Sequence, residues 1–380
     1  MSELLRTKFI RAIPALLLSL ICTISALAAD DFLDPRLLNP DSDYDPTPPP
    51  PVRGYRALYI SGYTAGNAKA FGAILAAIEG TEIDALVIDM RDQPGRVFYP
   101  TKLTLFQKSG AVTSVVADPA AMVANLKARG IRPIARIAVF CDDYLSRLDD
   151  GEWAVRDGRD GSVWEDQRGF AWLDPFAGGG RRAVVELAKE VAGFGFAEIQ
   201  FDYVRFPTYG AEDAYFPHWP GGARREDAIV AFLRLAREEL TPLGVEISAD
   251  VFGFSAWNAG ANLEGQTIER MLPYIDSLCP MYYPSHFGWN FLRAPDPKTR
   301  DRRIMSEGVK IAKKRVGESG VKVIPYLQGF PLGANNWGLN YVREQIEAAL
   351  GAGADGFIIW NADNVYGTTY KALKIRSGSK

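Results

Sequence analysis

The chain has 380 residues, of which 47% are hydrophobic and 23% are charged. This balance is that of an ordinary globular protein, and it excludes a disordered chain, a collagen-like chain and a membrane protein with many spans. The net charge of −3 lacks the basic excess that is typical of nucleic-acid-binding domains. With only two histidines, His218 and His286, a multi-histidine metal site is not favoured.

Residues 1–28 have the pattern of a secretory signal peptide. Lys8 and Arg11 form a basic start, an apolar stretch follows, and Ala26-Leu27-Ala28 matches a small-x-small cleavage site. The apolar stretch is shorter than the about 20 residues of a membrane span, so an uncleaved anchor helix is the less favoured alternative. The pattern predicts an exported protein, periplasmic or extracellular, with no stable membrane span after cleavage.

Residues 29–53 are rich in proline, which predicts an extended tether. We expect a single folded domain over residues 54–372 and a flexible tail over residues 373–380. The two cysteines that remain after cleavage, Cys141 and Cys279, fall on or beside different predicted strands. We expect both to be buried and reduced, because strands three and six of a barrel are not neighbours.

Eight short runs rich in β-branched and aromatic residues show little alternation, as expected of parallel strands that are covered on both faces. They are residues 55–61, 85–90, 132–140, 198–203, 246–252, 277–283, 322–328 and 356–361.

Amphipathic segments typical of helices lie between these runs, at residues 118–130, 181–193, 225–240, 301–316 and 341–351. Eight strand–helix units in one domain predict an α/β protein with a (β/α)₈ TIM barrel. An open doubly wound sheet is the alternative, but the turn after its first strand would normally carry a glycine-rich nucleotide loop, which this chain lacks.

Two connections are unusually long and follow the third and fourth predicted strands. The first, residues 141–180, contains a predicted β-hairpin around Asp157-Gly158 and Asp160-Gly161. The second covers residues 207–222. Loops of this length in a compact barrel are usually functional, and the strand C-termini of barrels carry the active site.

Two carboxylates stand out because they end otherwise apolar strands. Asp202 ends the fourth predicted strand and Asp250 the fifth, and a lone carboxylate there costs free energy unless it is paired or lies in a cleft. An ion pair with Arg205 is the structural alternative for Asp202. Two carboxylates on adjacent strand ends suit glycosidic bond cleavage, which needs a protonated acid and a nucleophile or base. Asp89 is a third candidate, with a structural pairing to a turn and Arg91 as its alternative.

Further polar and aromatic residues gather at the same strand ends, and sugars favour such amphipathic aromatic surfaces. The residues expected to bind substrate are Asp89, Arg91, Tyr203, Arg205, Trp257, Tyr282, Tyr283, His286, Gln328, Trp360 and Asn361. No metal ion and no cofactor is expected, because a metal-free acid–base pair is the simplest chemistry for this set.

Several motifs resemble those of the putative glycosyl hydrolase domain family of bacterial barrels, which is distantly related to α-amylase-like barrels. The matching stretches are residues 170–175, 200–207, 248–253, 280–284 and 356–361. The resemblance covers nearly the whole predicted domain and implies a (β/α)₈ barrel that acts on carbohydrate. In α-amylase-like barrels the strand-four Asp is the nucleophile and a strand-five Glu the acid/base. The resemblance therefore implies that Asp202 is the nucleophile and suggests retention, although strand five offers the shorter Asp250.

We therefore predict an exported glycoside hydrolase of a poly- or oligosaccharide, with Asp202 as nucleophile and Asp250 as general acid/base. A carbohydrate-binding barrel without turnover and a cell-envelope scaffold are the alternatives. The expected partner is a carbohydrate and not a nucleic acid.

Overall fold

The protein is described by a computed structural model that covers residues 54–260, 262–334 and 336–376. The predicted signal peptide and tether lie outside the described residues.

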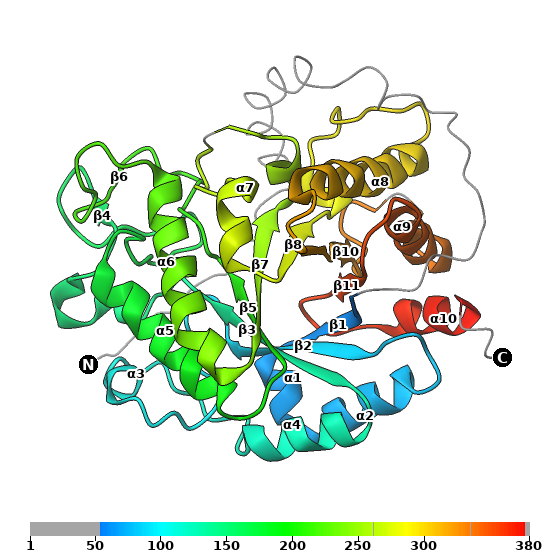
Figure 1. Cartoon of the computed structure of the whole chain (residues 1–380), viewed down its shortest axis with the longest axis horizontal. Coiled ribbons are helices and arrows are strands. Elements are labelled where there is room, and N and C mark those ends of the chain that lie inside the picture. The colour runs from blue at the N-terminus through cyan, green and yellow to red at the C-terminus, as the bar shows by residue number, and fades with distance from the viewer. Residues whose placement is uncertain (1–53, 261, 335, 377–380) are drawn as a thin grey trace, which may run out of the picture.

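Parallel strands close into a barrel around which the helices are arranged (Figure 1). The hydrogen-bonded order is β10-β11-β1-β2-β3-β5-β7-β8-β9, and a further pairing of β10 with β8 closes the circle. The strands of the barrel are β1 (Arg56–Ile60), β2 (Ala85–Arg91), β3 (Arg132–Ala138), β5 (Glu198–Asp202), β7 (Glu246–Phe252), β8 (Ser277–Met281), β9 (Lys322–Val323), β10 (Tyr326–Gln328) and β11 (Phe357–Trp360). The predicted (β/α)₈ barrel is confirmed.

The seventh strand position differs from the prediction because it is interrupted. The expected run over residues 322–328 is divided into β9 and β10 by Ile324 and Pro325. A proline has no backbone N–H to donate, so it interrupts a hydrogen-bonded strand. β9 pairs with β8, and β10 then pairs with both β8 and β11.

The five predicted helices are confirmed within a few residues of their expected ends. At the first of them, the Asp118 side chain accepts the backbone N–H of Ala121, which is a helix N-cap with proline at the next position. The α-helices are α1 (Gly62–Gly66), α2 (Ala68–Ile78), α3 (Thr104–Lys108), α4 (Pro119–Ala128), α5 (Gly178–Ala192), α6 (Arg225–Leu240), α7 (Ile268–Met271), α8 (Pro297–Val316), α9 (Leu339–Gly351) and α10 (Gly367–Arg376). Short 3₁₀ helices are η4 (Leu145–Arg147), η5 (Asp149–Gly151), η6 (Thr241–Leu243), η7 (Gly253–Ala256), η8 (Leu272–Tyr274) and η9 (Pro284–His286).

The two long loops are joined to each other beside the barrel mouth. β4 (Arg156–Asp157), in the loop after β3, pairs antiparallel with β6 (Ala214–Tyr215), in the loop after β5. The expected hairpin is present, since Arg156 also pairs with Val163 across it. Both connections therefore have a defined structure at the C-terminal side of the barrel.

Two apolar clusters stabilise the fold. The larger one lies between the strands and the helices, and the smaller one fills the barrel interior with residues such as Tyr55, Val87, Ile134 and Ile358. Cys141 and Cys279 are both buried and free, with Cys279 in the interior cluster.

The C-terminal helix extends past the expected domain boundary at residue 372. α10 continues to Arg376, Leu373 within it is buried, and the Arg376 guanidinium pairs with Glu82 at 2.6 Å. Among the described residues, no helix combines the length and apolar character that a membrane crossing requires.

Candidate active site

Four charged side chains meet inside the C-terminal end of the barrel, one from each of four neighbouring strands. Asp89 on β2, Arg136 on β3, Asp202 on β5 and Asp250 on β7 are all nearly inaccessible to solvent. Successive residues of a strand point to opposite faces, and parallel strands in register bring their inward residues to one level. Asp89 lies opposite Arg136 in the β2–β3 register, which places them together.

Arg136 is the centre of this group. Its Nη1 donates to Asp89 at 2.6 Å, and its Nε donates to an Asp202 oxygen at 3.1 Å, with a second contact from Nη2 to the same oxygen. The same Nε lies 3.8 Å from an Asp250 oxygen, and the guanidinium lies over the Tyr59 ring at 5.5 Å. One buried cation therefore faces three carboxyl groups, which leaves more carboxyl groups than positive charge in the site.

The sequence reasoning missed Arg136. The signal was available, because an arginine within the apolar run Ile134-Ala135-Arg136-Ile137 is as unusual as an aspartate at a strand end. Arg136 is also the register partner of Asp89 on the neighbouring strand, so both side chains point into the barrel.

Asp250 is the most isolated of the three carboxyl groups. It is 1% exposed, and neither of its oxygens has a hydrogen-bond partner among the described residues. Burial, followed by the nearby charge of Asp202, raises the pKa of Asp250 well above its ordinary value, and Arg136 opposes this only in part. This shift favours the protonated form of Asp250, which is the form that a general acid needs.

Asp202 lies in the opposite kind of environment. Beside the two contacts from Arg136, its second oxygen accepts the backbone N–H of Tyr203 at 2.5 Å. Tyr203 has a φ of 51°, a left-handed conformation that is rare for an aromatic residue and often marks a functional site. The charged partner and the unusual turn orient the Asp202 side chain in the barrel mouth.

Asp89 completes the group on the other side of Arg136. It accepts a hydrogen bond from the Tyr59 hydroxyl at 2.5 Å. Burial raises the pKa of Asp89 to about 6, against the opposing effects of Arg136 and the Tyr59 hydroxyl.

This pKa predicts a pH-dependent contribution to stability. Between about pH 4 and pH 6 the folded protein keeps a proton on Asp89 that the unfolded chain has released, so stability falls as the pH rises through this window. At neutral pH the buried charge costs roughly 2–3 kcal/mol relative to the unfolded chain. In Asp89→Asn this part of the pH dependence is absent, so the variant loses less stability between pH 4.5 and pH 7 in urea unfolding. Identical pH dependence in the two proteins would contradict the assignment.

Aromatic side chains line the barrel mouth next to these carboxyl groups. The half-buried Trp360 ring lies 5.5 Å from Tyr283, 6.0 Å from Tyr59 and 5.3 Å from Phe330. The exposed His286 ring is 5.1 Å from Tyr283. The predicted site residues Tyr283, His286 and Trp360 are thus brought to the mouth together with Asp89, Asp202 and Asp250.

Both predicted arginines have other roles. Arg91 is fully buried and pairs with Asp142, because the β2–β3 register shifts between Asp89 and Arg91. Arg205 makes no ion pair with Asp202 in the described part of the chain. Its guanidinium lies over the rings of Phe252 at 4.5 Å, Trp172 at 4.9 Å and Tyr203 at 5.0 Å, so it supports the loop after β5.

Trp257 and Tyr282 lie outside the barrel mouth, contrary to the prediction. Their rings are 5.8 Å apart and pack against α8, where a Cβ at Gly308 would meet both. Tyr282 points outward because its neighbour Tyr283 points inward, as adjacent residues of an extended strand do.

Gln328 and Asn361 hold the loops of the mouth instead of facing an open site. The Gln328 amide donates to the carbonyls of Phe330 and Leu332 at 3.0 and 2.8 Å. The Asn361 amide donates to the carbonyls of Gly329 and Val365 at 2.7 and 3.1 Å. Both side chains are buried, so their hydrogen bonds determine the shape of the mouth.

No group of three or more His, Cys, Asp or Glu side chains in the described part of the chain is arranged to hold a metal ion. The arrangement supplies a carboxyl group with a raised pKa (Asp250), a carboxyl group paired with a cation (Asp202), and a third carboxyl group whose pKa is raised to about 6 (Asp89).

Comparison with solved structures supports the barrel fold. The glycoside hydrolase domain of PgaB (BpsB) from Bordetella bronchiseptica superposes with a TM-score of 0.64 at 13% identity, covering 84% of this chain and 98% of that one. A chitinase from Chromobacterium violaceum gives a TM-score of 0.50 at 13% identity, covering 86% and 100%. At this identity the likeness shows the fold.

A hypothetical protein from Ruminiclostridium thermocellum is 34% identical over 51% of this chain and 97% of its own, with a TM-score of 0.47. No curated protein sequence matches the chain. The family model described as "Putative glycosyl hydrolase domain" matches residues 57–366, which confirms the resemblance seen in the sequence. The chain belongs to this glycosyl hydrolase domain family, which supports a glycoside hydrolase activity.

Proposed function

We propose that the protein hydrolyses a glycosidic bond of a poly- or oligosaccharide with Asp202 as nucleophile and Asp250 as general acid and base. The observation that carries this proposal is the contrast between two carboxyl groups around one nitrogen of Arg136. Asp202 is paired with the cation, whereas Asp250 has no hydrogen-bond partner and its pKa is raised. When the surroundings raise the pKa of one of two neighbouring carboxyl groups, that group suits the role of general acid and the other suits the role of nucleophile.

In the first step an Asp202 oxygen attacks the anomeric carbon while Asp250 gives its proton to the leaving glycosidic oxygen. In the second step Asp250, now ionised, takes a proton from a water molecule that attacks the same carbon. The bond to Asp202 breaks, and Asp250 is again protonated. Two displacements retain the anomeric configuration, in agreement with the α-amylase-like resemblance.

Exposed apolar side chains on the loops after the barrel strands support a long substrate. Six of the connections that follow barrel strands each have an exposed apolar side chain. These side chains are Tyr63, Tyr209, Leu263, Trp289, Leu332 and Val365. These loops surround the mouth, so a polysaccharide that extends beyond the catalytic group would contact several of them. The aromatic rings of Trp360 and Tyr283 suit the apolar face of a sugar ring beside the carboxyl groups.

A binding barrel without turnover is the second candidate, and one observation favours it. The ion pair of Asp202 with Arg136 is also what a purely structural aspartate would form. Release of reducing ends from a panel of polysaccharides by the protein from residue 54 onward distinguishes the two. Binding without any release by the unaltered protein would favour the second candidate.

The Asp250→Asn variant gives a more specific test of the proposed mechanism. We expect its turnover of natural glycosides to fall by roughly 10²–10⁴-fold, the usual contribution of general acid catalysis. Aryl glycosides with good leaving groups need little protonation, so their first step should be much less affected. The measurement is kcat/KM over a series of leaving groups, with Asp363→Asn as a control, because Asp363 is an exposed aspartate after β11. Equal losses on all leaving groups would contradict an acid role for Asp250.

We also propose that the protein acts outside the cytoplasm, as the pattern of residues 1–28 predicts. Fractionation of cells that express the full chain, with N-terminal sequencing of the mature protein, tests this point.

A further inference from the structure

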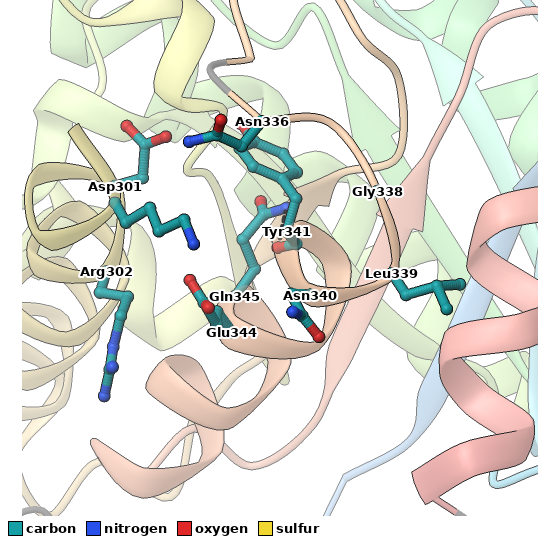
Figure 2. A pocket seen from close by; sticks show the side chains of 10 residues that line it. Asp301, Arg302, Asn336, Gly338, Leu339, Asn340, Tyr341, Glu344 and Gln345 are labelled. Carbon is teal, nitrogen blue, oxygen red and sulfur yellow. Dashed lines mark hydrogen bonds between the residues drawn. The ribbon is translucent and has the colours of Figure 1, made fainter.

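A cavity of about 340 Å³ lies between α8 and α9, away from the carboxyl groups of the barrel mouth. Figure 2 shows residues of both helices around it, with Asp301 and Arg302 on one side and Asn340 and Glu344 on the other. None of the four charged residues centred on Arg136 lines this cavity. Its volume is within the range of small-molecule sites.

The cavity exposes more apolar than polar surface, and the charged residues around it include both signs. Asp301 and Glu344 are matched by Lys298 and Arg302, so neither an anion nor a cation is specifically favoured. The amide of Asn340 adds a donor and an acceptor. Neither Glu344 nor Asn340 is used in an ion pair or side-chain hydrogen bond to another described residue. Apolar surface with a few donors and acceptors at its edge fits a neutral sugar, which has apolar ring faces and hydroxyl groups around them.

The back of the cavity contains an unsatisfied polar group. Tyr341 is 6% exposed, and its hydroxyl is buried without a hydrogen-bond partner in the described structure. Such a group costs free energy until a ligand or water satisfies it. The Tyr341 ring lies 5.6 Å from the Trp337 ring, so aromatic surface is also present. Gly338 before α9 supplies no side-chain cap, which leaves the first N–H groups of the helix for another acceptor.

The cavity lies on the same side of the barrel as the mouth, because α8 and α9 begin there after β8 and β10. One hydrogen-bonded connection joins the two places. Gln345 in the cavity wall bonds both backbone groups of Gln328, and Gln328 holds the carbonyl of Phe330. The Phe330 ring lies 5.3 Å from Trp360 in the mouth.

We propose that this cavity is a second carbohydrate-binding site that takes a neutral sugar unit and anchors a chain whose distal part occupies the barrel mouth. The proposal that this sugar is part of the substrate rests on the proposed function. The proposal that the cavity binds a neutral sugar does not depend on it.

The test uses calorimetric titration of the Asp202→Asn protein with pentasaccharides of β-1,4-glucose, α-1,4-glucose, β-1,4-mannose and β-1,4-N-acetylglucosamine. Two variants alter the cavity. The first combines Glu344→Gln and Asn340→Ala in one protein, and the second is Tyr341→Phe, which removes only the hydroxyl. Glu347→Gln is the matched control, since Glu347 lies one turn further along α9 and pairs with Arg343 and Arg376.

We expect two binding events for at least one pentasaccharide, and about tenfold weaker binding at one of them in the cavity variants, as the loss of one or two hydrogen bonds predicts. In the active protein the cavity variants should raise KM for the polymer by a similar factor and leave the hydrolysis of a small aryl glycoside unchanged. Binding that is equal in the cavity variants and in Glu347→Gln, or no second event with any of the four sugars, would overturn the inference. If the protein has no hydrolytic activity but the cavity variants lose sugar binding, the proposed function fails and the second site remains.

Discussion

Asp202→Asn should lower the turnover of any responsive glycoside by roughly 10⁴-fold or more, because an amide oxygen cannot serve as the nucleophile that forms the glycosyl intermediate. The substitution is nearly isosteric. It keeps one oxygen, which can accept either from Arg136 or from the Tyr203 backbone N–H, and places an amide NH₂ at the position of the other oxygen. The measurement is kcat/KM on an aryl glycoside, with Asp363→Asn as the matched control.

Loss of activity alone does not separate a nucleophile from a structural aspartate, so a rescue experiment is needed. In Asp202→Ala, added azide should enter from the face that the carboxylate left and give a glycosyl azide of inverted configuration. In Asp250→Ala, azide should instead intercept the intermediate and give the retained product. Failure of azide to restore any turnover in a well-folded Asp202→Ala protein, or full activity in Asp202→Asn, would remove Asp202 from the mechanism.

Replacing Arg136 with methionine should have the largest effect on stability. The change leaves the buried carboxyl groups of Asp89 and Asp202 without their cation, and removal of one partner from a buried ion pair typically costs about 3–5 kcal/mol. Urea unfolding at neutral pH measures this loss. Arg136→Lys keeps the charge without the planar fork and should recover part of the stability.

The same variant should change the pH profile of the activity. Arg136 lowers the pKa values of Asp89 and Asp250 against the effect of burial, so its removal raises both. If Asp250 is the acid, the basic limb of the kcat/KM profile must move to higher pH in Arg136→Met, at a temperature where the variant stays folded. Arg205→Met is the control, since it removes an equally buried arginine that lies over aromatic rings. It should lose stability and keep the position of the basic limb. A limb that stays in place in Arg136→Met would show that Arg136 is only structural.

The positions of the barrel strands could be predicted from the sequence alone. Strands covered on both faces must be apolar along their length, so each appears as a short run of β-branched and aromatic residues between amphipathic helices. Asp202 and Asp250 could be found for the same reason, because a carboxylate at the end of such a run is costly unless it has a function or a partner.

The direction of side chains near the strand ends was decided by the tertiary structure. A shift of one residue reverses the face to which a side chain points, and strand ends are where the register changes. The irregularity between Asp89 and Arg91 therefore turns Arg91 away from the mouth. Directly after β8, the extended backbone continues the alternation and sends Tyr282 outward and Tyr283 inward.

Tertiary structure also decided which cation pairs with Asp202. Proximity along the chain suggested Arg205, three residues away, but the barrel brings Arg136 to it from the neighbouring strand. The cavity between α8 and α9 was also decided by the tertiary structure, since its walls come from two helices that pack against each other only in the folded protein. Residue type and local pattern thus determined the strands and the carboxylates, whereas the pairing of charges across strands depended on the register of the closed barrel.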